Sequence, residues 1–214
     1  MRHRSRSLCL GHCALLAAAA CGPPAQAYTV SISPGSPRAI YLQVGVGSFT
    51  GGNYNSGGQP ANNPTINTVS VTVPTAAVGS GAAQAMASNT GATSSFLDGF
   101  AFCNTGELYV GGFYRLTSSG TGTATLTANS STALNNGSGS TIPFTQITWV
   151  SSGNGDTGTQ PFASGTFTGN ASQSIGGISS NQWAESCMTF SYLNTAVRAA
   201  GTYTGQVTYT LTAP

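Results

Sequence analysis

The sequence predicts an all-β fold, an immunoglobulin-like antiparallel β-sandwich forming a single domain, and three observations lead to this class. Over residues 202–213, apolar or small residues alternate strictly with threonine or glutamine, the period-two pattern of a strand with one buried face. Gly, Ser, Thr and Asn dominate residues 28–214, and helix formers at helical spacing are almost absent. Runs of β-branched and aromatic residues are separated by Gly, Asn and Ser turn signals.

The predicted strands are short apolar or alternating runs between turn signals, and they span residues 39–47, 67–73, 95–103, 107–116, 123–128, 142–150, 161–168, 183–193 and 202–213. Within 142–150 the apolar positions change parity, which predicts a β-bulge near Thr145 or Gln146. Residues 75–88 have room for a turn or two of helix. A β-solenoid is the rival architecture, but no repeat of roughly 20–30 residues is visible.

The first 27 residues have the pattern of a cleavable secretory signal. A basic start is followed by an apolar run and then by Ala25-Gln26-Ala27. We expect cleavage between Ala27 and Tyr28; a lipid-anchored form cut before Cys21 is the alternative. The apolar run is shorter than the roughly 20 residues of a spanning helix, so no membrane span is predicted.

Residues 28–214 would then form the mature chain, which carries few charges. It contains three arginines, four acidic residues, and neither lysine nor histidine. Nucleic-acid binding is excluded because it requires clustered cations that displace counterions from phosphates. The remaining cysteines are Cys103 and Cys187, and two thiols in an exported chain predict a disulfide.

No catalytic, cofactor or metal site is predicted. A nucleophilic hydrolase needs a base such as His or Lys beside its Ser or Cys, and neither occurs after the leader. A carboxylate pair of the glycosidase type is the enzymatic alternative, and the acids available for it are Asp98, Glu107, Asp156 and Glu185. We expect these acids to be surface charges or partners of the arginines.

The aromatic residues suggest a second class of function. Rings that lie exposed on strands or loops stack on sugars, whereas rings in strands more often fill the core. The candidates for such a platform are Tyr54, Trp149, Trp183, Tyr192, Tyr203 and Tyr209. A secreted carbohydrate-binding, lectin-like module is therefore the alternative function.

The last fifteen residues, 200–214, resemble the terminal strand of secreted pilin-type domains. This strand, with Tyr203, Val207, Tyr209 and Leu211 on one face, is similar to that of chaperone-usher fimbrial subunits and spore-coat-U-like proteins. The resemblance implies an incomplete immunoglobulin-like sandwich that is completed by a strand of the next subunit. Those families place their disulfide early in the chain, unlike the Cys103 and Cys187 pair.

The start of the mature chain is a candidate for the added strand. Tyr28, Val30 and Ile32 alternate with polar residues, and two prolines within residues 28–37 separate this extension from the body. The alternative is that it forms the first strand of its own domain. We therefore predict a non-catalytic secreted or cell-surface protein, a fimbria-like subunit or adhesive component. Its expected partners are copies of itself or related subunits, a periplasmic chaperone, or a glycan.

Overall fold

The computed structural model describes residues 29–118, 120–153 and 159–214 of the chain. The predicted leader, the Ala27–Tyr28 cleavage site and Asp156 lie outside these residues. The described residues form fifteen strands, and every pairing between them is antiparallel. The strands are β1 (Thr29–Ser31), β2 (Ala39–Val44), β3 (Phe49–Thr50), β4 (Gln59–Pro60), β5 (Val69–Ser70), β6 (Gln84–Ser88), β7 (Leu108–Arg115), β8 (Thr123–Ser130), β9 (Ala133–Asn135), β10 (Thr141–Pro143), β11 (Ile147–Ser152), β12 (Gly165–Thr166), β13 (Ser172–Ser179), β14 (Gln182–Tyr192) and β15 (Val207–Thr212). The predicted all-β class and antiparallel sandwich are confirmed.

The larger sheet is built around β14, its longest strand. The first half of β14 pairs with β7 on one side and with β1 on the other, and its second half pairs with β6 and β11. β2 adds to β7, β5 to β6 and β12 to β11. β2 is consequently an edge strand next to the first half of the sheet.

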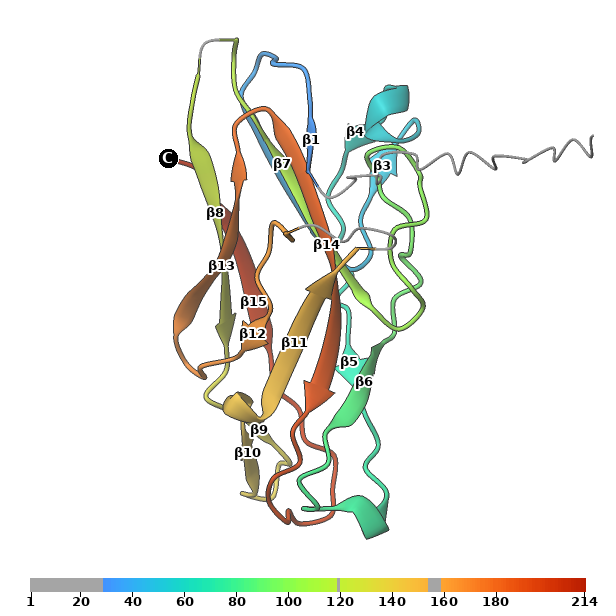
Figure 1. Cartoon of the computed structure of the whole chain (residues 1–214), viewed down its shortest axis with the longest axis vertical. Helices are drawn as coiled ribbons and strands as arrows, with labels where there is room; N and C mark the ends of the chain where they lie inside the picture. Colours follow the sequence, from blue (N-terminus) through green and yellow to red (C-terminus); the bar gives the residue numbers. More distant parts are fainter. Residues whose placement is uncertain (1–28, 119, 154–158) are drawn as a thin grey trace, which may run out of the picture.

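The smaller sheet has three strands in the order β13, β8, β15. In β8, alanine and leucine alternate with exposed threonines, and its burial alternates in the same way. Leu126 lies opposite Leu211 of β15, so the apolar faces of the two strands coincide. This sheet packs across the larger one (Figure 1), as the period-two pattern predicted.

Both sheets contribute side chains to the main core. Buried residues in it include Leu126, Ile178, Val110, Met188 and Trp149. Each belongs to the inward parity of its strand, because successive side chains of a strand point to opposite faces. Residues that pack only partly against this core belong largely to β2, β5 and β15, the strands at one side of the sandwich.

The opposite side of the sandwich is closed by the chain around residue 162. Phe162 forms an isolated bridge with Gly176 of β13, and the amide of Ala163 donates to the carbonyl of Ile175 at 2.6 Å. A Cβ on Gly176 would collide with the carbonyl oxygen of Pro161, so glycine permits this close approach. Since residues 165–166 pair with β11, this segment connects the two sheets.

A third layer of loops covers the outer face of the larger sheet (Figure 1). Residues 45–60 and 89–107 form this layer, and its side chains enclose a second core around Trp183, Phe113, Leu97 and Ile32. The disulfide between Cys103 of this layer and Cys187 of β14 joins the two, with a Cα–Cα distance of 5.5 Å. The predicted pairing of these two cysteines is therefore present.

The structure corrects several local predictions. The predicted strands 67–73, 161–168 and 202–213 are strands only over β5, β12 and β15, so Tyr203 lies before the last strand. Residues 95–103 do not form a strand: they turn at Asp98 and Gly99, which has a positive φ of 82°, so that Leu97 enters the second core. The change of parity after Phe144 arises from a 3-10 turn over Phe144–Gln146 rather than from a bulge.

Two further corrections concern β6 and β13, which the sequence analysis did not predict as strands. Residues 75–88 hold one 3-10 turn, Thr75–Ala77, followed by the strand β6. Strand β13 went unpredicted because its sequence, SQSIGGIS, is rich in Ser and Gly. Both strands owe their conformation to pairing, β6 with β14 and β13 with β8.

Candidate functional site

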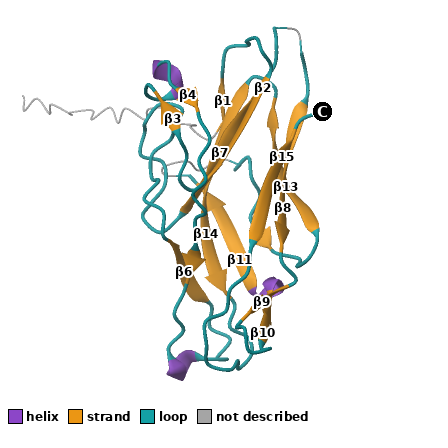
Figure 2. Ribbon diagram, turned by 180° about the vertical axis from the view of Figure 1, so that it is seen from behind, coloured by secondary structure: helices purple, strands orange, loops and turns teal. Residues whose placement is uncertain are grey.

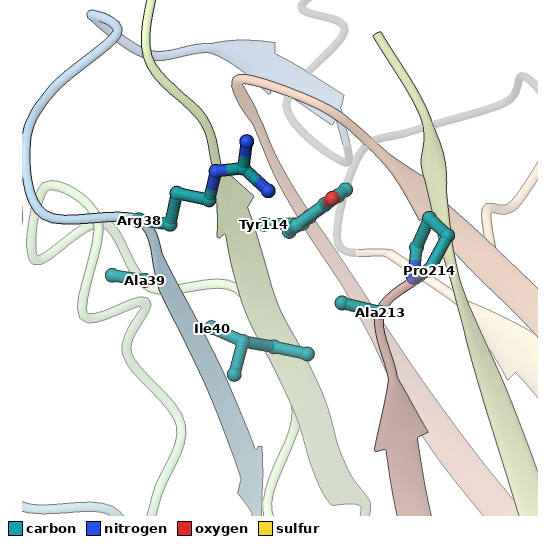
Figure 3. Close-up of a pocket in the computed structure, with 6 residues that line it drawn as sticks. All are labelled: Arg38, Ala39, Ile40, Tyr114, Ala213 and Pro214. Carbon is teal, nitrogen blue, oxygen red and sulfur yellow. The ribbon is translucent and has the colours of Figure 1, made fainter. Parts of the chain in front are cut away.

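At one side of the sandwich, β2 and β15 lie near one another without pairing (Figure 2). These strands belong to different sheets and run in opposite directions (Figure 3). β2 pairs only with β7, and β15 pairs only with β8. Within the described residues, no backbone hydrogen bond joins β2 to β15. We call the surface between them the open side.

Half of the backbone groups of β15 point toward the open side. Gln206 lies just before the strand, and its carbonyl accepts the amide of Ser131 at 2.8 Å. Because alternate residues of an antiparallel strand bond to the same neighbour, the even residues of β15 bond to β8. The amides and carbonyls of Val207, Tyr209 and Leu211 therefore face outward. None of them has a partner among the described residues.

The open side carries a stripe of apolar side chains. Leu42, Val44, Val207, Tyr209 and Leu211 are all half-buried and pack against the main core. Ile40, near the start of β2, is 45 % exposed. The stripe contains no charged residue, and natural sheet edges are usually protected by such residues, by proline or by bulges.

Two hollows lie along this stripe. The larger, of about 770 Å³, lies between β2, the loop 61–65 and Tyr209. The smaller, of about 140 Å³, lies at the other end, and its lining comprises Arg38, Ala39, Ile40, Tyr114, Ala213 and Pro214 (Figure 3). Ile40 points toward Ala213 across the gap. The two hollows thus border β2, while several Cα atoms of β2 and β15 lie within 8 Å of one another.

Tyr209 forms part of the wall of the larger hollow. Its hydroxyl donates to the sulfur of Met188 at 4.0 Å, a weak acceptor. Burial raises the pKa of Tyr209 above its ordinary value. The phenol is consequently neutral and serves as an apolar contact in this wall.

A buried carboxylate lies beneath the loop layer, at Glu185 of β14. Oε2 accepts hydrogen bonds from Ser95 Oγ at 2.6 Å, from Tyr109 OH at 2.6 Å and from Trp183 Nε1 at 2.9 Å. Glu185 is 2 % exposed. Ser95 belongs to the loop layer, while the other partners belong to the sheet, so the carboxylate links the two layers.

Burial raises the pKa of Glu185 from its ordinary value near 4.5, although its three hydrogen-bond donors act in the opposite direction. The charge of Asp98 raises it further, and Tyr109 likewise has a raised pKa because of burial and the neighbouring carboxylate. Burial therefore shifts the protonation equilibrium of this carboxyl group toward the neutral form, compared with an exposed glutamate.

This shift predicts a specific pH dependence of stability. Between pH 4.5 and the raised pKa of Glu185, the folded state binds more protons than the unfolded state. The free energy of unfolding should therefore fall as pH rises through this window and become constant above it. Denaturant titrations at several pH values check this, with Glu185→Gln as control because that variant has no proton to lose. An equal slope in both proteins would contradict the assignment.

The aromatic candidates for sugar binding lie mostly in the two cores. Trp149 is 3 % exposed, Trp183 is fully buried, and Tyr192 is 7 % exposed. Tyr54 is half-buried and packs on Phe113 and Trp183, with ring centroids 5.3 and 5.6 Å apart. Tyr203 is half-buried at the main core and donates to the carbonyl of Ala199. These rings do not form a common exposed platform.

The predicted strand donor lies in the larger sheet of its own chain. Val30 pairs with Trp183 through β1, and Ile32, which is 7 % exposed, enters the second core. This is the arrangement that the sequence analysis gave as the alternative. Three residues of the segment are paired with β14, and the amide of Ile32 donates to the carbonyl of Asn181 at 2.9 Å. Tyr28 lies outside the described residues.

The described acidic residues are spread over different environments. Glu107 accepts hydrogen bonds from the amide of Asn104 and the hydroxyl of Thr189, whereas Asp98 is exposed and bonds the amide of Phe100. Among the described residues, the one group of three potential metal ligands is Cys103, Glu107 and Cys187. Its two sulfurs are bonded to each other, which leaves one carboxylate.

Two features of the site carried no recognisable sequence signal. The open side depends on which strands become edges, and Glu185 was expected at the surface.

The described residues include no helix that is sufficiently long and apolar to cross a membrane. Comparison of the chain with family models, with curated proteins and with solved structures returned no match.

Proposed function

We propose that this protein is a non-catalytic structural subunit of an extracytoplasmic surface, which associates with copies of itself by strand addition at the open side. The observation that supports this proposal best is the edge of β15. It combines unpaired backbone groups with a half-buried apolar stripe, and an incoming extended segment satisfies both at once. The resemblance of residues 200–214 to pilin-type terminal strands agrees with this role.

The proposed donor is the segment 28–33 of a second copy. It alternates apolar and polar residues, so Val30 and Ile32 would project toward the same face at a spacing that matches alternate residues of β15. In its own chain the segment is held by the three-residue pairing of β1, by the hydrogen bond from the Ile32 amide to the Asn181 carbonyl and by the burial of Ile32, and it would leave these contacts to act as a donor. Pro34 and Pro37 follow directly and favour an extended connection to the body.

The proposed location follows from the leader and the composition. A signal pattern directs the chain to an extracytoplasmic space, where the Cys103–Cys187 disulfide is stable. A periplasmic chaperone that covers the open side before assembly is a further proposed partner. We also propose that the strands of the sandwich are connected in an immunoglobulin-like order.

A charge placed on the open side tests the proposal. Ile40→Lys should reduce the fraction of assembled protein at least tenfold, because a strand covering β2 would have to desolvate the ammonium group. Ile40 is already 45 % exposed, so the fold should tolerate the change. Sedimentation velocity on the purified mature protein measures the assemblies.

The matched control is Val197→Lys. Val197 is 77 % exposed and lies away from the open side, so this variant adds the same charge without affecting strand addition. Equal assembly by the two variants, or a wild-type protein that stays monomeric at all concentrations, would rule the proposal out.

A further inference from the structure

Three parts of the chain form the walls of the larger hollow: β2, the loop 61–65 and Tyr209 of β15. Its volume of about 770 Å³ lies within the range of roughly 300–1,000 Å³ that is usual for small-molecule sites. The lining contains no charged residue. An ionic group in the hollow would lose water without gaining an ion partner, so the hollow favours an uncharged ligand.

Hydrogen bonds fix the loop of the larger hollow against the bend that follows β2. Gly45 begins this bend with a φ of 73°, a conformation that favours glycine. The side chain of Asn63 donates to the carbonyl of Gly47 at 2.9 Å, and the amide of Ala61 donates to the carbonyl of Ser48 at 2.8 Å. The hollow is consequently formed before a ligand enters, as in most small-molecule sites.

Polar side chains on the loop and the bend are free to bind a ligand. Asn62 and Thr65 are exposed, Ser48 is half-buried, and all three line the hollow. Their side chains have no hydrogen-bond partner among the described residues, because the bonds of this loop use the side chain of Asn63 and the backbone. Amide and hydroxyl side chains both donate and accept hydrogen bonds. They therefore suit a ligand that carries hydroxyl groups.

The walls that face these polar groups are largely apolar. They consist of Leu42 and Val44 of β2 and of Tyr209, all half-buried against the main core. The hydroxyl of Tyr209 is engaged with the sulfur of Met188, so its ring is the part available to the hollow. Apolar ring faces stack on the C–H faces of sugars. A sugar combines such a face with a rim of hydroxyls, as the two kinds of wall require.

The edge of β2 gives no straight line for a backbone to pair along this hollow. β2 ends at Val44, and the chain then bends. What the hollow offers to a ligand is therefore its side chains. A peptide strand binds chiefly through main-chain hydrogen bonds, whereas a saccharide binds through side chains.

We propose that the larger hollow binds an uncharged oligosaccharide. The hydroxyls of the oligosaccharide bond to Asn62, Ser48 and Thr65, and the apolar face of one sugar ring packs on Tyr209. This inference goes beyond the proposed function and does not depend on assembly, because a single copy of the chain supplies every wall. It gives the protein an adhesive site in addition to its proposed self-association.

The test titrates tetrasaccharides into the isotope-labelled mature protein and follows backbone amide shifts by NMR. The neutral probes are built from glucose, galactose, mannose or N-acetylglucosamine, and the acidic probe is tetragalacturonate. At least one neutral probe should shift the amides of Leu42, Asn62 and Thr65 but not those of β8. The Asn62→Ala, Thr65→Ala double variant should bind this probe about five- to tenfold more weakly, because two groups that bond to its hydroxyls are lost.

The matched control is the Asn55→Ala, Thr208→Ala double variant. Both residues are exposed, and neither lines a hollow, so this protein should bind as the wild type does. Tyr209→Phe should also retain binding, since the hydroxyl points to Met188, whereas Tyr209→Leu should weaken it at least fivefold through loss of the ring. Circular dichroism spectra verify that the variants are folded.

The outcomes decide on the site, the class of ligand and the assembly separately. Equal affinity of the two double variants would place the sugar elsewhere and overturn the proposal, as would a wild-type protein that binds none of the probes or only tetragalacturonate. Sedimentation velocity reports assembly independently. Assembly without sugar binding overturns this inference alone, and sugar binding by a protein that stays monomeric contradicts only the proposed function.

Discussion

Replacing Cys103 and Cys187 together by alanine should lower the free energy of unfolding by about 4–5 kcal/mol. The bond closes a loop with a sequence separation of 84 residues, and in the chain-entropy treatment a cross-link over such a loop removes this much conformational freedom from the unfolded state. Guanidinium denaturation of the oxidised wild type and of the double variant measures the difference. A loss below about 1 kcal/mol would contradict this account.

Removal of the disulfide should also loosen one region of the protein more than the rest. Cys103 lies in the loop layer, and Cys187 lies in β14, so removal of the bond frees the loop layer from the sheet beneath it. On removal of the bond, the hydrogen exchange rates of the amides of residues 93–103 should increase more than those of β8, which belongs to the other sheet. Uniform acceleration in both regions would indicate only a global loss of stability.

Trp183→Ala should lower the free energy of unfolding by about 3–5 kcal/mol, as large-to-small changes of buried aromatic residues do. Trp183 is fully buried, and four further aromatic rings lie with centroids 5.6–6.1 Å from its own: Tyr41, Phe49, Tyr54 and Phe113. The variant also removes the indole donor of the buried Glu185. Urea or thermal denaturation provides the measurement.

Two further variants provide the comparison for Trp183→Ala. Trp183→Phe keeps most of the ring contacts but has no N–H group. Its loss of stability therefore reports mainly the hydrogen bond, and the further loss in Trp183→Ala reports the cavity. Ile66→Ala is the surface control, since Ile66 is 80 % exposed and exposed substitutions usually change stability by less than about 0.5 kcal/mol. If Trp183→Ala cost no more than Ile66→Ala, the second core would contribute little to folding.

These two predictions concern the stability of the scaffold, and they have a bearing on the proposed assembly. β7 and β14 lie between the two cores, and β2 is attached to them through β7 alone. A firmly packed loop layer therefore holds β2 as one border of the open side. Strand addition requires such a border, because apolar side chains must meet hollows of fixed shape.

Local patterning was sufficient to predict the paired, half-buried strands. In β8 and β15 apolar residues alternate with polar ones up to Ala128 and Leu211, and one face of each strand packs on the core, because a two-residue side-chain period can bury only one face. The disulfide also followed from local chemistry, since residues 28–214 contain two cysteines.

Only the tertiary structure decided which strands became edges and what they expose. β13 has a Ser- and Gly-rich sequence and is a strand through its pairing with β8, while residues 95–103 have an apolar sequence and instead cover the sheet. The burial of Glu185 and the open side arise from groups far apart in the chain. Their physical cause is long-range pairing and burial, which no period within a short window of sequence records.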